Sequence, residues 1–463
     1  MNARPRACLR LSPARLIALA SCGACLALGG VAHAGNSDTF FLGNDAAMQG
    51  GAVTATTRGG SAVWYNPAGL AVTTHDSVDV SASAYLLRFG GSPDLKPTDG
   101  SAWTRRKLST LDLSAVPTAF AIVRRISGWT FGLGLFVPNR VVETPRTSLR
   151  TRASDTAPAA ELTVDDNDRF TEYYAGLSVG HTLSSRLRLG VSVFGYYSSA
   201  FDTRAQSVSS GDSPTTSAYA ITHSTLDQQR LGLQVVWGLQ WDAAKTWHVG
   251  FVFRSPVFQL YQLSQLIQVD AASNTGGAPP DSRFDLTFAE KYGIQATRLH
   301  PMRAHVGVSH EVGSGSVAVD ASLQPPFHDI AASRVTSTVV NGRAGGRMPI
   351  SENVWVGAGV FTDLAPTRNL TRAGDAAIDY YGASIAIDLA TPYNVLSDRA
   401  KRPAPVRSLI MSTTLALSYA FGTGRLANLG LAADGSGALT IAPVGDNVTV
   451  HEFVLHIGST LLN

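Results

Sequence analysis

The stretch from Leu231 to Asp242, LGLQVVWGLQWD, decides the fold because its large apolar side chains recur at every second position. Strand side chains alternate between two faces, so this period predicts a β-strand with one apolar face and one mainly small or polar face. A helix would spread the same residues around its circumference. The apolar face consists of Leu231, Leu233, Val235, Trp237, Leu239 and Trp241.

The same period returns at residues 129–137, 187–194, 247–254 and 411–422. These runs are longer than the usual soluble strand of about 5–6 residues and suit tilted strands that cross a bilayer. Aromatic residues gather near strand ends, as in the girdles of membrane barrels. A soluble β-sandwich with surface aromatics is the alternative. The aromatics concerned are Trp129, Tyr173, Tyr174, Tyr196, Tyr197, Trp241, Trp247, Tyr380 and Tyr381.

About fourteen strands are predicted, joined by connections that alternate between long and short. Outer-membrane barrels have short periplasmic turns and longer outer loops, so the alternation predicts a transmembrane antiparallel β-barrel, an all-β fold. The connection 391–406 breaks the rule, and 282–295 is either a strand extension or a hairpin in a long loop. The predicted strands are 77–89, 110–123, 129–140, 169–182, 187–199, 225–241, 246–260, 298–311, 316–325, 334–348, 353–363, 376–390, 407–422 and 447–460.

The first 34 residues have the features of a secretory signal peptide. An apolar stretch from Leu16 to Val31 follows several arginines and ends at the cleavage pattern Ala32-His33-Ala34. A lipoprotein signal that would end at Cys22 is the alternative. All of the cysteines lie in this leader, so the mature chain would contain none. They are Cys8, Cys22 and Cys25.

The composition narrows the classes of function. Charged residues make up 15% of the chain, and the net charge of +3 is spread without a dense basic stripe. Nucleic-acid binding therefore has no support. No stretch of about 18 apolar residues follows the leader, so a spanning chain would have to cross the membrane as a closed barrel.

Three short motifs resemble catalytic or metal-binding sites, but a purely structural role explains each of them better. Ser178 stands in a G-x-S-x-G pattern, yet the hydrolase elbow needs a strand-to-helix turn, and here alternation continues. His305 and His310 are five apart, which puts them on opposite faces of a strand. The acidic run 165–168 suits a solvated loop better than a calcium site. The sequence thus predicts no enzyme, no metal and no cofactor.

Residues 35–75 do not alternate, and they are rich in Gly, Ala and Thr. The run WYNPAGLA at 64–71 contains an Asn-Pro turn, because proline fixes its own φ and restricts the residue before it. The chain therefore divides into a signal peptide at 1–34, a compact irregular segment at 35–75 and a barrel at 76–463.

This segment resembles the N-terminal signature of the FadL-type outer-membrane transporters of fatty acids and aromatic hydrocarbons. The resemblance rests on 43–52 (GNDAAMQGGA) and 61–71 (SAVWYNPAGLA), with a second similar stretch at 116–121 and 132–138. The chain ends in Leu-Leu-Asn rather than in the aromatic residue that the barrel assembly machinery usually recognises in such proteins.

The resemblance implies a fourteen-stranded barrel in the bacterial outer membrane, with an N-terminal hatch plugging the lumen. A hydrophobic small molecule, most simply a long-chain fatty acid, would enter an internal pocket and leave sideways into the lipid at a kinked third strand. The hatch motif consists of Asn66, Pro67, Ala68, Gly69 and Leu70, and its first three residues would then lie by this exit, facing the strand near 129–140. Its function is either gating or only the seating of the hatch.

Gly132 and Gly134 are the candidates for the bend of the third strand, since glycine weakens strand pairing and allows close backbone approach. A non-transporting structural or adhesion barrel is the alternative function.

Overall fold

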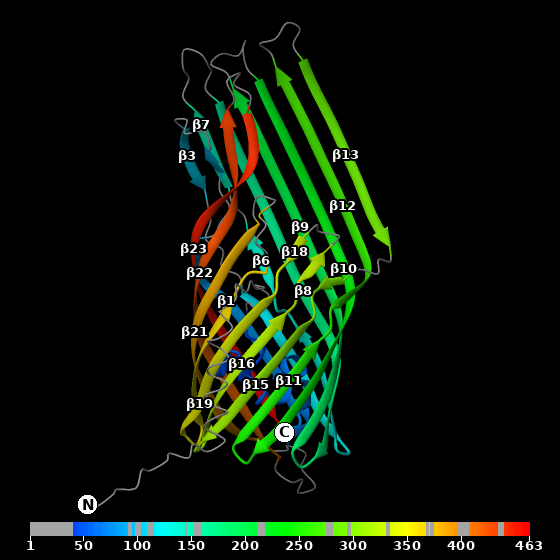
Figure 1. Cartoon of the computed structure of the whole chain (residues 1–463), viewed down its shortest axis with the longest axis vertical. Coiled ribbons are helices and arrows are strands. Elements are labelled where there is room, and N and C mark those ends of the chain that lie inside the picture. Colours follow the sequence, from blue (N-terminus) through cyan, green and yellow to red (C-terminus); the bar gives the residue numbers. More distant parts are fainter. Residues whose placement is uncertain are drawn as a thin grey trace, which may run out of the picture. The chain divides into compact units, whose positions relative to one another are not determined.

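A computed structural model of the chain describes the following ranges: 40–90, 95–97, 103–108, 115–143, 146–151, 160–210, 218–274, 281–293, 298–329, 334–366, 370, 375–395, 407–433 and 439–463. The predicted signal peptide and the first residues of the predicted hatch lie outside them. The described chain is dominated by long antiparallel strands (Figure 1).

The strands close into an antiparallel barrel of 14 strands. Three of the fourteen are interrupted and carry two labels each, and the ladder between β1 and β23 closes the sheet. In chain order the wall consists of β1 (Ser77–Phe89), β4 (Ala115–Ile126), β5 (Trp129–Phe136) with β6 (Arg140–Glu143), β8 (Ala160–Ser184), β9 (Leu187–Ser210), β10 (Ala218–Ala244), β11 (Trp247–Arg254) with β12 (Val257–Asn274), β14 (Arg298–His300) with β15 (Arg303–Val312), β16 (Gly315–Gln324), β19 (Val339–Ser351), β20 (Val354–Asp363), β21 (Ala376–Val395), β22 (Arg407–Ala433) and β23 (Leu439–Leu462).

All of the predicted strands are present, and the short turns lie where they were predicted. The strands next to the long connections, however, extend much further than expected. The acidic run 165–168 belongs to β8, so its assignment to a loop was wrong. Pattern alone misses these extensions because beyond the lipid both faces of a strand meet water and the apolar alternation fades, while the ladder hydrogen bonds continue.

Further strands lie at the loop end. Residues 281–293 form β13 (Asp281–Gly293), which pairs with the outer part of β12. Of the two alternatives for 282–295, the structure therefore has the hairpin in a long loop. The remaining short strands are β2 (Leu95–Pro97), β3 (Trp103–Leu108), β7 (Arg146–Thr151), β17 (Phe327–Asp329) and β18 (Arg334–Thr336).

The two faces of the wall differ as the alternation requires. Leu177 and Trp237 point outward and are 67% and 55% exposed, whereas their chain neighbours Ser178 and Gly238 face the lumen. An outer surface this apolar is suited to lipid rather than to water. Within the described residues, no helix is long and apolar enough to cross a membrane.

Residues 40–76 form a separate compact segment before the first strand. It contains α2 (Asn44–Met48), α3 (Gly59–Tyr65) and the 3-10 helix η1 (Pro67–Val72). The helices are short and most residues of the segment are buried, so its order depends on packing against the inward face of the wall.

We predict that Leu177→Arg destabilises the folded barrel by about 2–4 kcal/mol, the cost of a cation on the lipid face near the midplane. The free energy of unfolding, measured by denaturant titration in phospholipid vesicles, tests this. Leu177→Phe is the control, since it keeps the site apolar. Equal stability of the two variants would contradict an outward, lipid-facing Leu177.

Candidate functional site

Asn66 links the interior segment to the barrel wall. Its amide nitrogen donates to the carbonyl oxygens of Thr54, at 2.7 Å, and of Leu239 on β10, at 3.1 Å. Its amide oxygen accepts from the backbone N–H of Ala68 at 3.1 Å and so caps η1, with Pro67 at the first helical position. Asn66 is fully buried, so water cannot take the place of any of these hydrogen bonds.

The backbone of the segment lies directly against inward-facing glycines of the wall. A Cβ atom added to Gly190 would lie 2.2 Å from the carbonyl carbon of Pro67, a distance that no real side chain tolerates. The small residues on the lumen face of these strands are therefore required, because another backbone approaches the wall closely there. Other wall glycines in such contact with the segment are Gly180, Gly238, Gly250, Gly345, Gly357 and Gly359.

The structure places the predicted motif residues against different strands than expected. Pro67 and Ala68 touch β9 and β10 at Gly190 and Gly238, and Gly69 packs closely on the carbonyl of Thr57 inside the segment. Leu70 packs near Gly132 of β5 and thus meets the third strand. Asn66 itself therefore lies at β10 rather than facing residues 129–140.

The third strand is interrupted after the two candidate glycines, not at them. Gly132 and Gly134 sit in a regular ladder, paired with β4 on one side and β8 on the other. The regular strand stops at Phe136 and resumes at Arg140, with Pro138 in between. Proline lacks the N–H that a ladder needs, which gives the interruption its physical cause.

Across this interruption the strand keeps one backbone hydrogen bond to each neighbouring strand. Val137 N–H donates to Thr118 O at 2.9 Å, and Glu172 N–H donates to Asn139 O at 3.1 Å. Among the described residues, β6 pairs with β8 and has no ladder with β4. The residues before Ala115, at 109–114, lie outside the described part of the chain.

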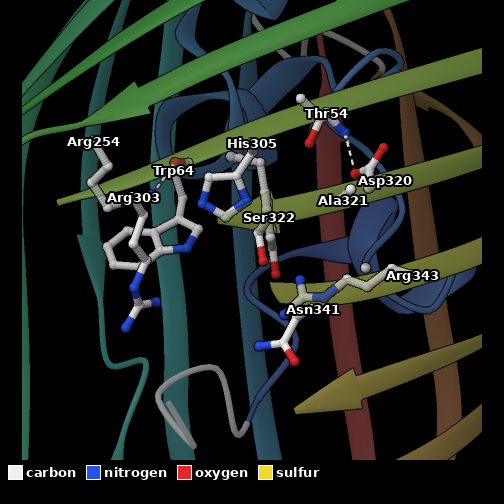
Figure 2. Close-up of a pocket in the computed structure, with 12 residues that line it drawn as sticks. Thr54, Trp64, Arg254, Arg303, His305, Asp320, Ala321, Ser322, Asn341 and Arg343 are labelled. Atoms are coloured by element: carbon white, nitrogen blue, oxygen red, sulfur yellow. Dashed lines mark hydrogen bonds between the residues drawn. The ribbon is translucent and has the colours of Figure 1, made fainter. Parts of the chain in front are cut away.

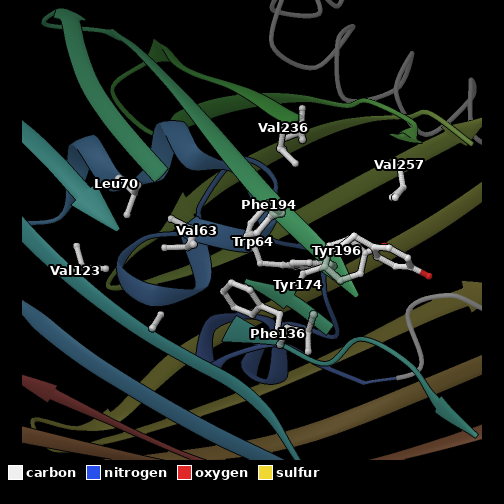
Figure 3. Close-up of a cluster of buried hydrophobic side chains, with 14 of the residues drawn as sticks. Val63, Trp64, Leu70, Val123, Phe136, Tyr174, Phe194, Tyr196, Val236 and Val257 are labelled. Carbon is white, nitrogen blue, oxygen red and sulfur yellow. The ribbon is translucent and has the colours of Figure 1, made fainter. Parts of the chain in front are cut away.

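A cluster of aromatic rings fills the lumen between the segment and this part of the wall (Figure 3). Trp64 of α3 is at its centre, with ring centroids 5.2 Å from Phe136, 5.1 Å from Tyr174 and 5.7 Å from Phe194. Edge-to-face and tilted contacts of this kind stabilise aromatic cores beyond their buried area. The cluster makes the lumen apolar at this level.

Charged groups border the aromatic cluster on the loop side (Figure 2). The Arg254 guanidinium lies 4.2 Å above the Trp64 ring and donates to Trp64 O at 2.7 Å and to Gln234 Oε1 at 3.1 Å. Both of these acceptors are neutral, and the guanidinium is held by a cation–π contact as well. Arg303 and Arg343 line the same part of the lumen.

A buried carboxylate stands opposite these cations. Glu172 of β8 is 3% exposed, and its Oε1 lies 2.6 Å from His300 Nε2 and accepts from the Tyr196 hydroxyl at 2.9 Å. We use the term loop-side cavity for the space lined by Trp64, Pro138, Glu172, Tyr174, Gln234, Arg254, His300, Pro301 and Arg303.

The sequence analysis missed these polar residues. Glu172, Arg254 and Arg303 stand at inward positions of strands, where a polar residue on the lumen face is ordinary for a barrel. The signal that marks them is the proline break in three wall strands, at Pro138, Pro256 and Pro301. Two of these breaks, at Pro138 and Pro301, line the loop-side cavity.

The motifs that resembled chemical sites have structural roles. Ser178 lies within β8, and its hydroxyl is 2.6 Å from that of Ser192, which donates to Val63 O. His310 stacks on the outward Trp247, whereas His305 lines the lumen, so the two histidines point to opposite faces as predicted. In the acidic run, Asp165 pairs with Arg146 at 3.5 Å.

No family model matches the sequence, and no curated protein matches it. Solved structures do match. A FadL homologue of Pseudomonas aeruginosa is 14% identical, with a TM-score of 0.57 over 93% of this chain and 99% of that one. The chain has the FadL-type transporter fold. The toluene transporter TodX of Pseudomonas putida is 12% identical, with a TM-score of 0.56 over 91% of this chain and 98% of that one.

A third structure of the FadL-type fold, the monoaromatic hydrocarbon channel CymD, is 12% identical, with a TM-score of 0.54 over 91% of this chain and 97% of that one. These proteins are transport proteins rather than enzymes. The match spans nearly their whole length. At these identities the likeness concerns the fold.

We predict that Gly190→Val displaces the interior segment, because the new side chain overlaps Pro67. Overpacking of this kind costs about 1–3 kcal/mol. Limited proteolysis of the segment and denaturant unfolding measure the effect. Gly195→Val on the same strand is the control, since a Cβ at Gly195 meets only an ordinary contact at 3.6 Å. Equal losses of stability at both glycines would contradict close packing of the interior segment on Gly190.

Asn66→Ala is predicted to destabilise the seated segment by about 1–3 kcal/mol for each buried partner left unsatisfied. The partners are Thr54 O, Leu239 O and Ala68 N–H. Hydrogen exchange of residues 54–72 measures the loosening directly. Asn447→Ala, at an exposed position of β23, controls for loss of an asparagine. Unchanged exchange would rule out Asn66 as the link between segment and wall.

Proposed function

We propose that this protein is a bacterial outer-membrane channel for the passive uptake of hydrophobic compounds, with long-chain fatty acids as its favoured substrates. The observation that carries the proposal is the loop-side cavity, where an aromatic floor meets arginine side chains inside a barrel of the FadL-type fold. An amphiphile with an apolar tail and an anionic head matches both halves of that lining.

The tail would be captured by transfer from water to the aromatic cluster. Each CH₂ group contributes about 0.8 kcal/mol on burial, so a long chain needs no chemical step for capture. Trp64, Pro138 and Tyr174 supply the apolar surface of the loop-side cavity. Uptake down a concentration gradient then needs only a path through the lumen.

The head group would be recognised by Arg254 and Arg303. A carboxylate accepts charge-assisted hydrogen bonds from guanidinium groups, which a neutral hydrocarbon cannot do. TodX and CymD are named as transporters of toluene and of monoaromatic hydrocarbons. The arginines favour an anionic amphiphile over such a neutral ring in this chain.

The exit would be lateral, into the lipid. The interruption of the third strand at Pro138 lies beside the loop-side cavity. In this proposal residues 35–75 act as a hatch that blocks a straight passage, and Asn66 seats it. The alternative is a non-transporting structural or adhesion barrel whose interior segment is a permanent plug.

The test is uptake of radiolabelled oleate by cells that lack their own fatty acid porter, with and without this protein in the outer membrane. Arg303→Gln is predicted to reduce oleate uptake about tenfold or more, since a hydrogen bond to a charged group contributes about 1.5–3 kcal/mol. Arg303→Lys keeps the charge and is the matched control. Toluene uptake should be equal in all three proteins.

Each outcome of this experiment has a distinct meaning. Absence of oleate uptake by the inserted wild-type protein would overturn the fatty acid channel. If toluene also failed to enter, only the structural or adhesion barrel would remain. If Arg303→Gln slowed oleate and toluene alike, the head-group role of Arg303 would be wrong.

A further inference from the structure

We propose that Phe136 is the gate between two internal cavities and that its side chain sets which molecules pass from one to the other. The gate is argued from geometry, and only the identity of what passes rests on the proposed function. Phe136 is the last residue of β5, next to the strand break at 137–139.

The second cavity lies on the turn side of Phe136, between the interior segment and strands β1 and β4. We call it the turn-side cavity. Its lining consists mostly of small or apolar groups, and Phe136 is the largest of them. It shares no lining residue with the loop-side cavity, although Trp64 of the latter has its ring centroid 5.2 Å from that of Phe136. The lining includes Leu42, Ser61, Ser81, Ala119, Ala121 and Phe136.

The Phe136 ring lies between the two cavities, since it lines the turn-side cavity and contacts Trp64, which lines the loop-side cavity. It is 1% exposed and lies folded back over Gly134, where an added Cβ would be 2.4 Å from its Cε2 atom. Gly134 therefore provides the seat for the closed ring, as glycine does under aromatic rings in other sheets. This contact explains Gly134 better than a bend in the strand does.

Phe136 is also the ring in this cluster that is best placed to move. Trp64 is covered by Arg254, and the Tyr196 hydroxyl is bonded to Glu172. Phe194 has no polar group either, but it stands in the middle of β9 with ladder partners on both sides. Phe136 also pairs on both sides, with Ala119 and Tyr174, but it is the last residue of β5. Its ring carries no polar group, so a rotation of the ring meets packing forces alone.

The consequence is a barrier that depends on one side chain. With the ring seated on Gly134, a molecule in the loop-side cavity does not reach Ala121. With the ring removed, the two cavities join along the inner face of β4 and β5. Phe194 lines neither cavity, so its removal should leave them separate.

Cysteine labelling tests this, because the natural cysteines all lie in the predicted signal peptide. Ala121→Cys reports the turn-side cavity, and Ser322→Cys reports the lumen on the loop side. N-ethylmaleimide is added to intact cells and labelled peptides are counted by mass spectrometry. Phe136→Ala should speed labelling at position 121 about tenfold, a change of about 1.4 kcal/mol in the barrier.

The matched control is Phe194→Ala, which removes a ring of the same size from the same cluster. It should leave labelling at position 121 at the wild-type rate. Neither variant should change labelling at position 322. Heat-modifiable migration on gels confirms that each barrel is folded. If Phe136→Ala does not fold, Phe136→Leu replaces it. Its labelling rate at position 121 should lie between those of the wild type and a variant without the ring.

Two results would overturn the gate. One is labelling at position 121 in the presence of Phe136 as fast as at position 322. The other is equal acceleration by Phe136→Ala and Phe194→Ala. If the labelling pattern holds while the wild-type protein takes up no oleate, the gate stands and the proposed substrate fails.

Discussion

Every backbone N–H and C=O group of a strand in lipid must find a partner, and that requirement makes the sheet close on itself. The closing ladder between β1 and β23 is also where the interior segment is tied down. The Asp79 carboxylate accepts from the Gly60 N–H at 3.1 Å and from the Thr460 hydroxyl at 2.6 Å, and the Asn44 amide donates to Thr460 at 3.0 Å. Closure of the barrel and seating of the segment therefore share one set of contacts.

The second constraint is space inside the closed wall. A backbone segment that crosses the lumen can touch the wall only where the wall has no side chain, and this accounts for glycines such as Gly190 at inward positions. Glycine weakens a strand by itself. Here the loss is offset by burial of the segment, and at Gly134 and Gly176 by aromatic rings that fold over the bare backbone.

The strands and their alternation were predictable because a strand that separates lipid from a packed lumen has a strict period of two. Strand ends were less predictable, as the extension of β8 over residues 165–168 demonstrates. The motif at Asn66 was recognisable, but its partner Leu239 was not, since that contact spans 173 residues of sequence. Glu172, Arg254 and Arg303 were missed, because a polar residue at an inward position is ordinary in a barrel and only the nearby proline breaks set these three apart.

By itself, the sequence determined the all-β architecture, the order of strands and turns, and a separate segment before the first strand. Those properties follow from local periodicity and from turn residues. Only the tertiary structure decided which side chains meet in the lumen, where the third strand breaks, and that Gly134 seats the Phe136 ring. Closure brings together residues from opposite ends of the chain, and no local pattern records which inward positions will then face one another.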